Sequence, residues 1–106
     1  MSELIITDAN FTTEVLQSQV PVLVDFWAPW CAPCLQLSPL VAELANEYSD
    51  RLKVGTLNVD EHMQTAGRFG IMSLPTLLIF KNGQVVDQSL GVQPKDVLKQ
   101  RIERVL

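Results

Sequence analysis

The chain has 106 residues, of which 47% are hydrophobic and 19% charged, and its formal net charge is −4. This length and composition predict one soluble domain over residues 1–106 with a core of its own. The negative charge and the absence of a Lys/Arg cluster argue against a nucleic-acid surface, and apolar runs such as residues 21–28 are too short to cross a membrane. The first residues lack the pattern of a secretion signal, so we expect the cytoplasm, or an organelle interior if a transit peptide has been removed.

The first predicted elements are a strand over residues 4–7 and a helix that Thr7 or Asp8 caps. The apolar face of this helix carries Phe11, Val15 and Leu16. Residues 20–28, VPVLVDFWA, are apolar on both faces, which predicts a central strand that is covered on both sides.

A long amphipathic helix is predicted after Cys31, because the apolar residues there recur at helical spacing. Its stripe consists of Leu37, Leu40, Val41, Leu44, Ala45 and Tyr48. Residues 52–59 then read as another strand, and residues 63–69 as a short helix.

A β-hairpin is predicted where Lys81-Asn82-Gly83 separates the strand patterns of residues 76–80 and 84–90, because Asn-Gly favours a type I′ turn. Pro94 then begins a final helix. Its inward face carries Val97, Leu98, Ile102 and Val105. The order βαβαβαββα predicts an α/β fold whose sheet is parallel at first and ends with an antiparallel hairpin.

The two cysteines of the chain, Cys31 and Cys34, stand in the stretch WAPWCAPCLQLSPL. A structural disulfide is one interpretation, but so small a loop gives little stabilisation. Metal binding is another, although two cysteines and the distant His62 are fewer than the four ligands of a structural zinc site. The third interpretation is a redox couple.

The local pattern favours the redox couple. A buried strand ends just before Cys31 and a helix follows, so Cys31 should lie at the helix N-terminus, where unpaired amides and the helix dipole stabilise a thiolate. Cys34 falls on the same side of the first turn, within disulfide distance. Pro33 is tolerated there because the amide hydrogen it lacks would have no partner. Cys31 would attack a disulfide and Cys34 would resolve the mixed disulfide.

At this point the chain resembles the thioredoxin family over residues 4–105. The matching stretches are VDFWA (24–28), WCAPC (30–34), Pro39, LNVD (57–60), Gly70-Ile71, LPT (74–76), FKNG (80–83) and Gly91. The resemblance implies the thioredoxin fold, a central five-stranded mixed sheet flanked by four helices. It also implies a protein-disulfide oxidoreductase and electron carrier without a cofactor or metal, in which Cys31 is the nucleophile and Cys34 the resolving thiol.

The resemblance also assigns a site around the cysteines. Pro75 would be a cis proline facing the disulfide, although the residues alone favour a trans proline that begins a strand. Target proteins would bind to a shallow apolar rim. The rim residues are Trp30, Ala32, Pro33, Leu74, Pro75, Gly91 and Val92. The implied partners are target proteins with disulfides and a thioredoxin reductase, dependent on NADPH or ferredoxin, and we expect a monomer.

Asp25 interrupts the otherwise apolar central strand. Its side chain either points into a solvated gap or is a desolvated acid with a raised pKa. The matching acid in the resembled family accepts the proton of the resolving cysteine, here Cys34, so the resemblance implies this catalytic role for Asp25.

Four residues depart from the family pattern. Ala32 stands where typical thioredoxins carry glycine, and Ser73 replaces a common glycine. Leu35 replaces a basic residue and should be exposed. Thr56 replaces a lysine that many relatives place near the buried acid, so Asp25 should stay protonated to a higher pH than in those relatives.

Two other functions remain open on the same residues. A disulfide oxidase or isomerase would share the fold, but such relatives usually carry histidine between the cysteines and an export signal. A binding module could use the rim around Trp30 and Pro75 without turnover.

Overall fold

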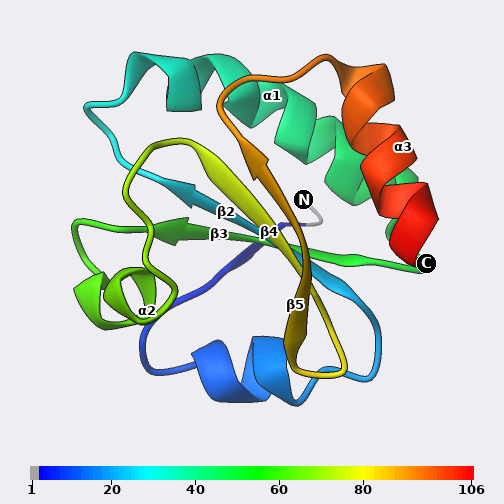
Figure 1. Cartoon of the computed structure of the whole chain (residues 1–106), viewed down its shortest axis with the longest axis horizontal. Helices are drawn as coiled ribbons and strands as arrows, with labels where there is room; N and C mark the ends of the chain where they lie inside the picture. Colours follow the sequence, from blue (N-terminus) through cyan, green and yellow to red (C-terminus); the bar gives the residue numbers. More distant parts are fainter. Residues whose placement is uncertain (1–2) are drawn as a thin grey trace.

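The computed structural model describes residues 3–106, so residues 1 and 2 of the expected domain lie outside the described residues. A five-stranded sheet with the order β1-β3-β2-β4-β5 forms the centre of the molecule (Figure 1). The strands are β1 (Glu3–Ile5), β2 (Val22–Trp27), β3 (Lys53–Asn58), β4 (Thr76–Lys81) and β5 (Gln84–Leu90). Strands β1 and β2 both run parallel to β3, and β4 is antiparallel to β2 and β5. The predicted mixed sheet is confirmed.

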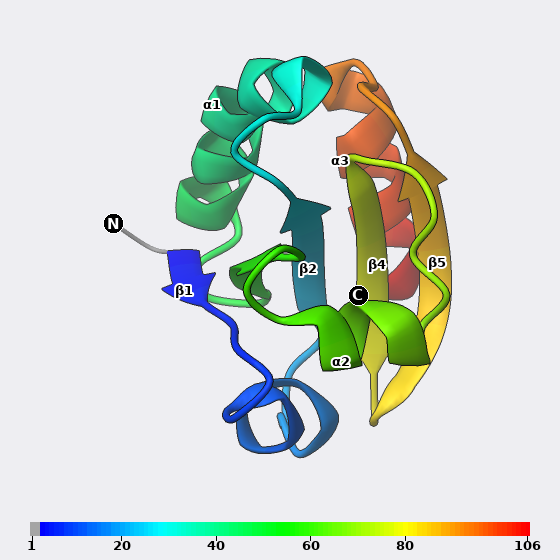
Figure 2. The same cartoon turned by 90° about the vertical axis from the view of Figure 1, so that its left-hand side faces the viewer.

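Four helices flank this sheet within residues 3–106. They are the short π-helix η1 (Thr12–Leu16), α1 (Ala32–Glu47), α2 (Met63–Arg68) and α3 (Lys95–Val105). Helices α1 and α3 cover one face, while η1 and α2 cover the other (Figure 1). Figure 2 shows β1 and β5 at opposite edges, with β2 and β4 between them. The fold expected from the resemblance is therefore present.

Strand β2 divides the core because its successive side chains point to opposite faces of the sheet. Leu23 faces α1 and α3 and belongs to one buried cluster. Val22, Val24 and Phe26 face η1 and α2 and belong to the other. All residues of β2 except Trp27 are buried, as predicted for a strand covered on both sides. Asp25 alternates with these three residues, so its carboxyl group points to the α1 face.

Helix α1 packs against the sheet through the stripe that the sequence predicts. Leu37, Val41 and Leu44 are buried in the core, and Leu40 packs against it half-buried. On the other face, the aromatic rings of Phe11, Phe69 and Phe80 lie 5.2–5.6 Å apart between centroids. This triad joins η1, the end of α2 and β4, so each face of the sheet has a packed layer of its own.

The prediction for the start of the chain was wrong in two respects. Neither Thr7 nor Asp8 caps η1, which follows Phe11 without a side-chain cap. Thr7 instead forms a turn with Asn10, in which each side chain accepts the other's backbone amide. The carboxylate of Asp8 accepts the amide and the hydroxyl of Thr65, at 2.9 and 2.6 Å. Asp8 therefore satisfies an N-terminal amide of α2 and not of η1. The second error concerns the first strand, which was predicted to reach residue 7 and ends at Ile5.

The hairpin between β4 and β5 has the predicted turn. Asn82 and Gly83 have φ values of 55° and 78°, as a type I′ turn requires. In α3, Leu98 and Ile102 are buried as predicted, while Val97 and Val105 are half-buried.

Candidate redox site

The two cysteines lie at the N-terminus of α1, directly after β2 and a short turn. Cys31 is the N-cap residue, and the backbone amide of Cys34 donates a hydrogen bond to its sulfur at 3.2 Å. The two residues form a disulfide, with 5.2 Å between their Cα atoms. An amide aimed at the Cys31 sulfur and the dipole of a 16-residue helix both stabilise negative charge on that sulfur. Both features act on the sulfur of Cys31, the N-cap residue.

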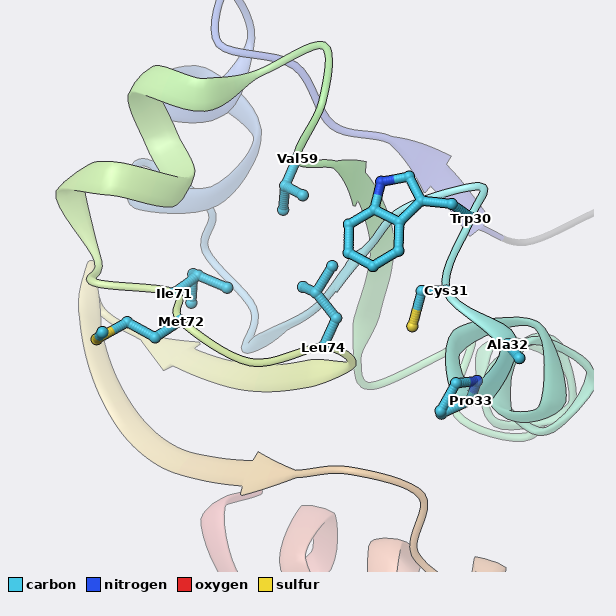
Figure 3. A pocket seen from close by; sticks show the side chains of 8 residues that line it. All are labelled: Trp30, Cys31, Ala32, Pro33, Val59, Ile71, Met72 and Leu74. Carbon is cyan, nitrogen blue, oxygen red and sulfur yellow. The ribbon is translucent and has the colours of Figure 1, made fainter.

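A groove of about 490 Å³ opens beside Cys31. It is lined by Trp30, Cys31, Ala32, Pro33, Val59, Ile71, Met72 and Leu74. Figure 3 shows residues 30–33 on one side of this groove and Ile71, Met72 and Leu74 on the other. The lining is mainly apolar side chains and holds one sulfur of the disulfide. An apolar surface thus borders Cys31.

The predicted rim residues fall into two groups. Trp30, Ala32, Pro33 and Leu74 line the groove with Cys31. The others, Pro75, Gly91 and Val92, are not among its lining residues.

Gly91 and Pro75 nevertheless belong to the same region of the structure. The Leu74–Pro75 peptide bond is cis, as the resemblance implies, and Pro75 is buried. The amide of Gly91 donates to the carbonyl of Pro75 at 2.9 Å, with Gly91 at φ 75°. Val92 follows with an exposed side chain. This contact places the end of β5 beside the loop that carries Leu74.

Trp30 presents a large apolar surface at the groove. Its side chain is 70% exposed, although its indole nitrogen donates to Asp60 at 2.9 Å. A tryptophan whose polar atom is already paired offers the rest of its ring for contact with a partner at little loss of side-chain freedom.

Three lining residues were missed by the sequence analysis: Val59, Ile71 and Met72. Val59 follows β3 just as Cys31 follows β2, and the carboxyl ends of parallel neighbours meet at one edge of a sheet. That rule could have placed Val59 at the site. Ile71 and Met72 come from the loop before Leu74, for which no periodic pattern exists. Met72 is 96% exposed and points away from Cys31 (Figure 3).

Asp25 lies on the other side of the disulfide. Its side chain is 3% exposed, and its Oδ1 atom has no hydrogen-bond partner in the described part of the chain. Burial, and secondarily the negative charge of Glu3, raises the pKa of Asp25 to about 7. The sequence left open whether Asp25 points into a solvated gap or is a desolvated acid, and its burial favours the desolvated acid. Register places Thr56 beside Asp25, and the threonine supplies no positive charge.

Leu35 is more than half exposed, as expected for a residue off the apolar stripe of α1. Nowhere in residues 3–106 do three or more His, Cys, Asp or Glu side chains come together in a group that could hold a metal ion. Within the same residues, no helix has the length and apolar character needed to cross a membrane.

Comparison with known proteins settles the family. Residues 2–104 match the family model described as Thioredoxin. The chain is 52% identical over 101 residues to Thioredoxin 1 of Nostoc sp., covering 95% of this chain and 94% of the relative. It is 46% identical over 100 residues to Thioredoxin of Bacillus subtilis, covering 94% of each. The chain belongs to the thioredoxin family.

Family membership and the geometry of the cysteine pair together define the chemistry of the site. In the thioredoxin family, a Cys-x-x-Cys pair at disulfide distance carries out dithiol–disulfide exchange, and this chain holds that pair at the start of α1. The redox-active group is thus part of the polypeptide. Family membership also points in general terms to two kinds of partner, a reductase and proteins with disulfides.

Proposed function

We propose that this chain is a thioredoxin-type protein-disulfide reductase that passes electrons from a thioredoxin reductase to disulfides of target proteins. The observation that carries the proposal is the placement of Cys31. Its sulfur accepts a hydrogen bond from the Cys34 amide at the start of α1, and the residue borders the groove beside Trp30. A stabilised thiolate next to an apolar binding surface has the two properties that attack on a protein disulfide requires.

The reaction begins with the reduced protein. The Cys31 thiolate attacks one sulfur of the target disulfide, so that a Cys31–target S–S bond forms and the target's own S–S bond breaks. The second target sulfur leaves with the electron pair and takes up a proton. The groove residues Trp30, Ala32, Pro33 and Leu74 hold the target segment during this step, with Pro75, Gly91 and Val92 completing the rim. The backbone next to Pro75 pairs with the target as an added strand.

Cys34 then resolves the mixed disulfide. Its thiol gives up a proton to the carboxylate of Asp25, directly or through water, and the resulting thiolate attacks the Cys31 sulfur. The Cys31–Cys34 bond forms, the Cys31–target bond breaks, and the target sulfur leaves as a thiolate. Two electrons have then passed to the target. Asp25 suits this role because a pKa of about 7 lets it both accept and release a proton near neutral pH.

The remaining parts of the proposal concern the surroundings of the protein. A reductase dependent on NADPH or on ferredoxin returns the disulfide to the dithiol, in the cytoplasm or in an organelle interior. The protein acts as a monomer over residues 1–106 and contributes to electron transport and cell redox homeostasis. It neither binds nucleic acid nor associates with a membrane.

Reduction of insulin disulfides by dithiothreitol tests the proposal, because precipitation of the free insulin B chain reports each turnover. We expect the parent to accelerate precipitation and Cys31→Ser to be inactive. Cys34→Ser should complete the first step only and accumulate a mixed disulfide that mass spectrometry detects. A parent protein that does not accelerate precipitation would refute the reductase function. Equilibration with glutathione separates a reductase from an oxidase, since a reductase couple stays oxidised in buffers that reduce a strong oxidant.

A further inference from the structure

A second pocket lies on the α1 face of the sheet, next to Cys34 rather than Cys31. Its volume is about 210 Å³, and its lining residues are Glu3, Asp25, Trp27, Cys34, Leu35, Ser38 and Thr56. The space is large enough for several water molecules, each of which occupies about 30 Å³ in the liquid. The two sulfurs of the disulfide thus border different spaces: Cys31 borders the apolar groove, and Cys34 borders a pocket that contains two carboxyl groups.

The second carboxyl group belongs to Glu3, and the register of the sheet explains its position. Ile5 pairs with Thr56, which pairs with Asp25, so these side chains share the α1 face. Glu3 stands two residues before Ile5 and points to the same face. Two strand spacings of about 4.8 Å separate β1 from β2, and Glu3 also lies two residues, about 7 Å, back along the strand direction. The Cα atoms of Glu3 and Asp25 are therefore about 12 Å apart. Glu3 is half-buried at the rim of the pocket.

The other elements around Asp25 supply no positive charge. Helix α1 contributes the sulfur of Cys34 and the hydroxyl of Ser38 to this pocket. Strand β3 contributes Thr56, and β4 pairs Leu77 with Asp25. Lys53 of β3 points to the opposite face, where its Nζ binds Glu14. In the described part of the chain, Glu3 is therefore the charged side chain that lines this pocket with Asp25, and Cys34 adds a titratable thiol only after the disulfide is reduced.

We propose that Glu3 is a positioning residue for resolution of the mixed disulfide: its charge at the rim of the polar pocket adds to the burial of Asp25 in setting the pH at which Asp25 can accept the Cys34 proton. This inference rests on the proposed function, since it concerns the second step of that reaction. A negative charge nearby disfavours ionisation of Asp25, in the same direction as burial does. Asp25 therefore becomes a competent base only near neutral pH. The proton received from Cys34 later leaves through the pocket, past Glu3, to solvent.

Three variants test the role of Glu3. Glu3→Gln removes the charge and keeps the shape, and Glu3→Lys reverses the charge. Glu61→Gln is the control, because it changes the net charge equally from an exposed position outside the pocket. The first measurement is the ¹³C NMR titration of the Asp25 carboxyl carbon in the oxidised proteins. We expect the midpoint to fall by about half a pH unit to one unit in Glu3→Gln, further in Glu3→Lys, and not in the control.

The second measurement is the stopped-flow rate of resolution, followed by tryptophan fluorescence across pH 5–9. In Glu3→Gln, the rising limb of this pH profile should move to lower pH by the same amount as the NMR midpoint, while formation of the mixed disulfide keeps its rate. A purely structural role for Glu3 would change stability and leave both midpoints in place. Unmoved midpoints in both Glu3 variants, with insulin reduction intact, would overturn this inference alone. Loss of insulin reduction by the parent protein would instead refute the proposed function.

Discussion

Replacement of Asp25 by asparagine should remove a loss of stability that the parent protein undergoes as the pH rises to neutral. Burial raises the pKa of Asp25 from 3.8 to about 7. Between these values the folded protein keeps a proton that the unfolded chain has lost, so the free energy of unfolding falls as the pH rises. The interval spans about three pH units at 1.36 kcal/mol each, so the loss amounts to about 4 kcal/mol and is complete above pH 7.

Asparagine has the shape of aspartate but does not titrate, so the variant lacks this slope. Any fixed cost of burying the amide is the same at every pH and does not affect the comparison. We therefore expect the stability difference, variant minus parent, to grow by about 4 kcal/mol in favour of the variant from pH 4 to pH 8. Urea unfolding of the oxidised proteins, monitored by tryptophan fluorescence, measures this difference. Asp50→Asn is the matched control at an exposed site, and its profile should stay parallel to that of the parent.

Parallel profiles for Asp25→Asn and the parent would show that Asp25 ionises in the folded protein as it does in the unfolded chain. The assignment of Asp25 as a base poised near neutral pH would then be wrong. The same variant should slow resolution of the mixed disulfide more than its formation, because only resolution takes a proton from Cys34.

Three further substitutions test the packing around the site. Gly55→Ala should destabilise the protein by about 1–3 kcal/mol in urea unfolding, because a Cβ there would lie 2.9 Å from Ile6 Cδ1 and still closer to Cγ1; an unchanged midpoint would contradict this packing. Tyr48→Phe should cost about 1 kcal/mol through loss of the 2.8 Å hydrogen bond to Glu103. Adding Glu103→Gln to the Tyr48→Phe variant should then cost less than Glu103→Gln does in the parent, because within residues 3–106 only the exposed ion pair with Arg51 is left to lose. Met72→Gln should raise the KM for insulin about two- to fivefold and leave kcat unchanged, because the variant keeps the length of the side chain and loses apolar contact surface at the groove; a fall in kcat alone would contradict this.

The sequence predicts the elements whose signals are local. Strand β2 is found because an apolar run covers both of its faces, and the β4–β5 hairpin is found because Asn82-Gly83 suits one turn type. The start of α1 is found for the same kind of reason, since a change of periodicity follows Cys31. These features depend on neighbouring residues only, so one sequence is enough to identify them.

The failures involve contacts between distant parts of the chain. Asp8 has the chemistry of an N-cap, but the amide that it satisfies belongs to Thr65, 57 residues further along. The local rule identified the right function for this side chain and the wrong helix. The cis bond before Pro75 follows from the family resemblance, whereas the residues alone favour the trans form. No local pattern distinguishes these alternatives, because tertiary contacts select between them.

The part of the site around Asp25 lies between these cases. An acid within an apolar strand is conspicuous in the sequence, and a raised pKa was one of two interpretations. The position of Glu3 was not foreseen, because it depends on β1 pairing with β3 rather than with β2, and on the register of that pairing. A one-residue shift of β1 would turn Glu3 to the opposite face of the sheet.

The two pockets suggest how the sequence can tune the two steps of the reaction separately. Cys31 borders the apolar groove and Cys34 borders the polar pocket, with the first turn of α1 between them. Substitutions in the groove change contact with the target, so they should act on formation of the mixed disulfide. Substitutions in the polar pocket change the charge near Asp25, so they should act on the pH dependence of resolution.

Leu35 borders the polar pocket and is more than half exposed, so Leu35→Lys would add a cation there without filling the groove. If the two steps are separable, this variant should shift the pH profile of resolution to lower pH. The rate of mixed-disulfide formation at pH 8 should stay within about twofold of the parent rate. A change of that size in the rate of formation would reflect the weak, screened attraction between the new cation and the Cys31 thiolate.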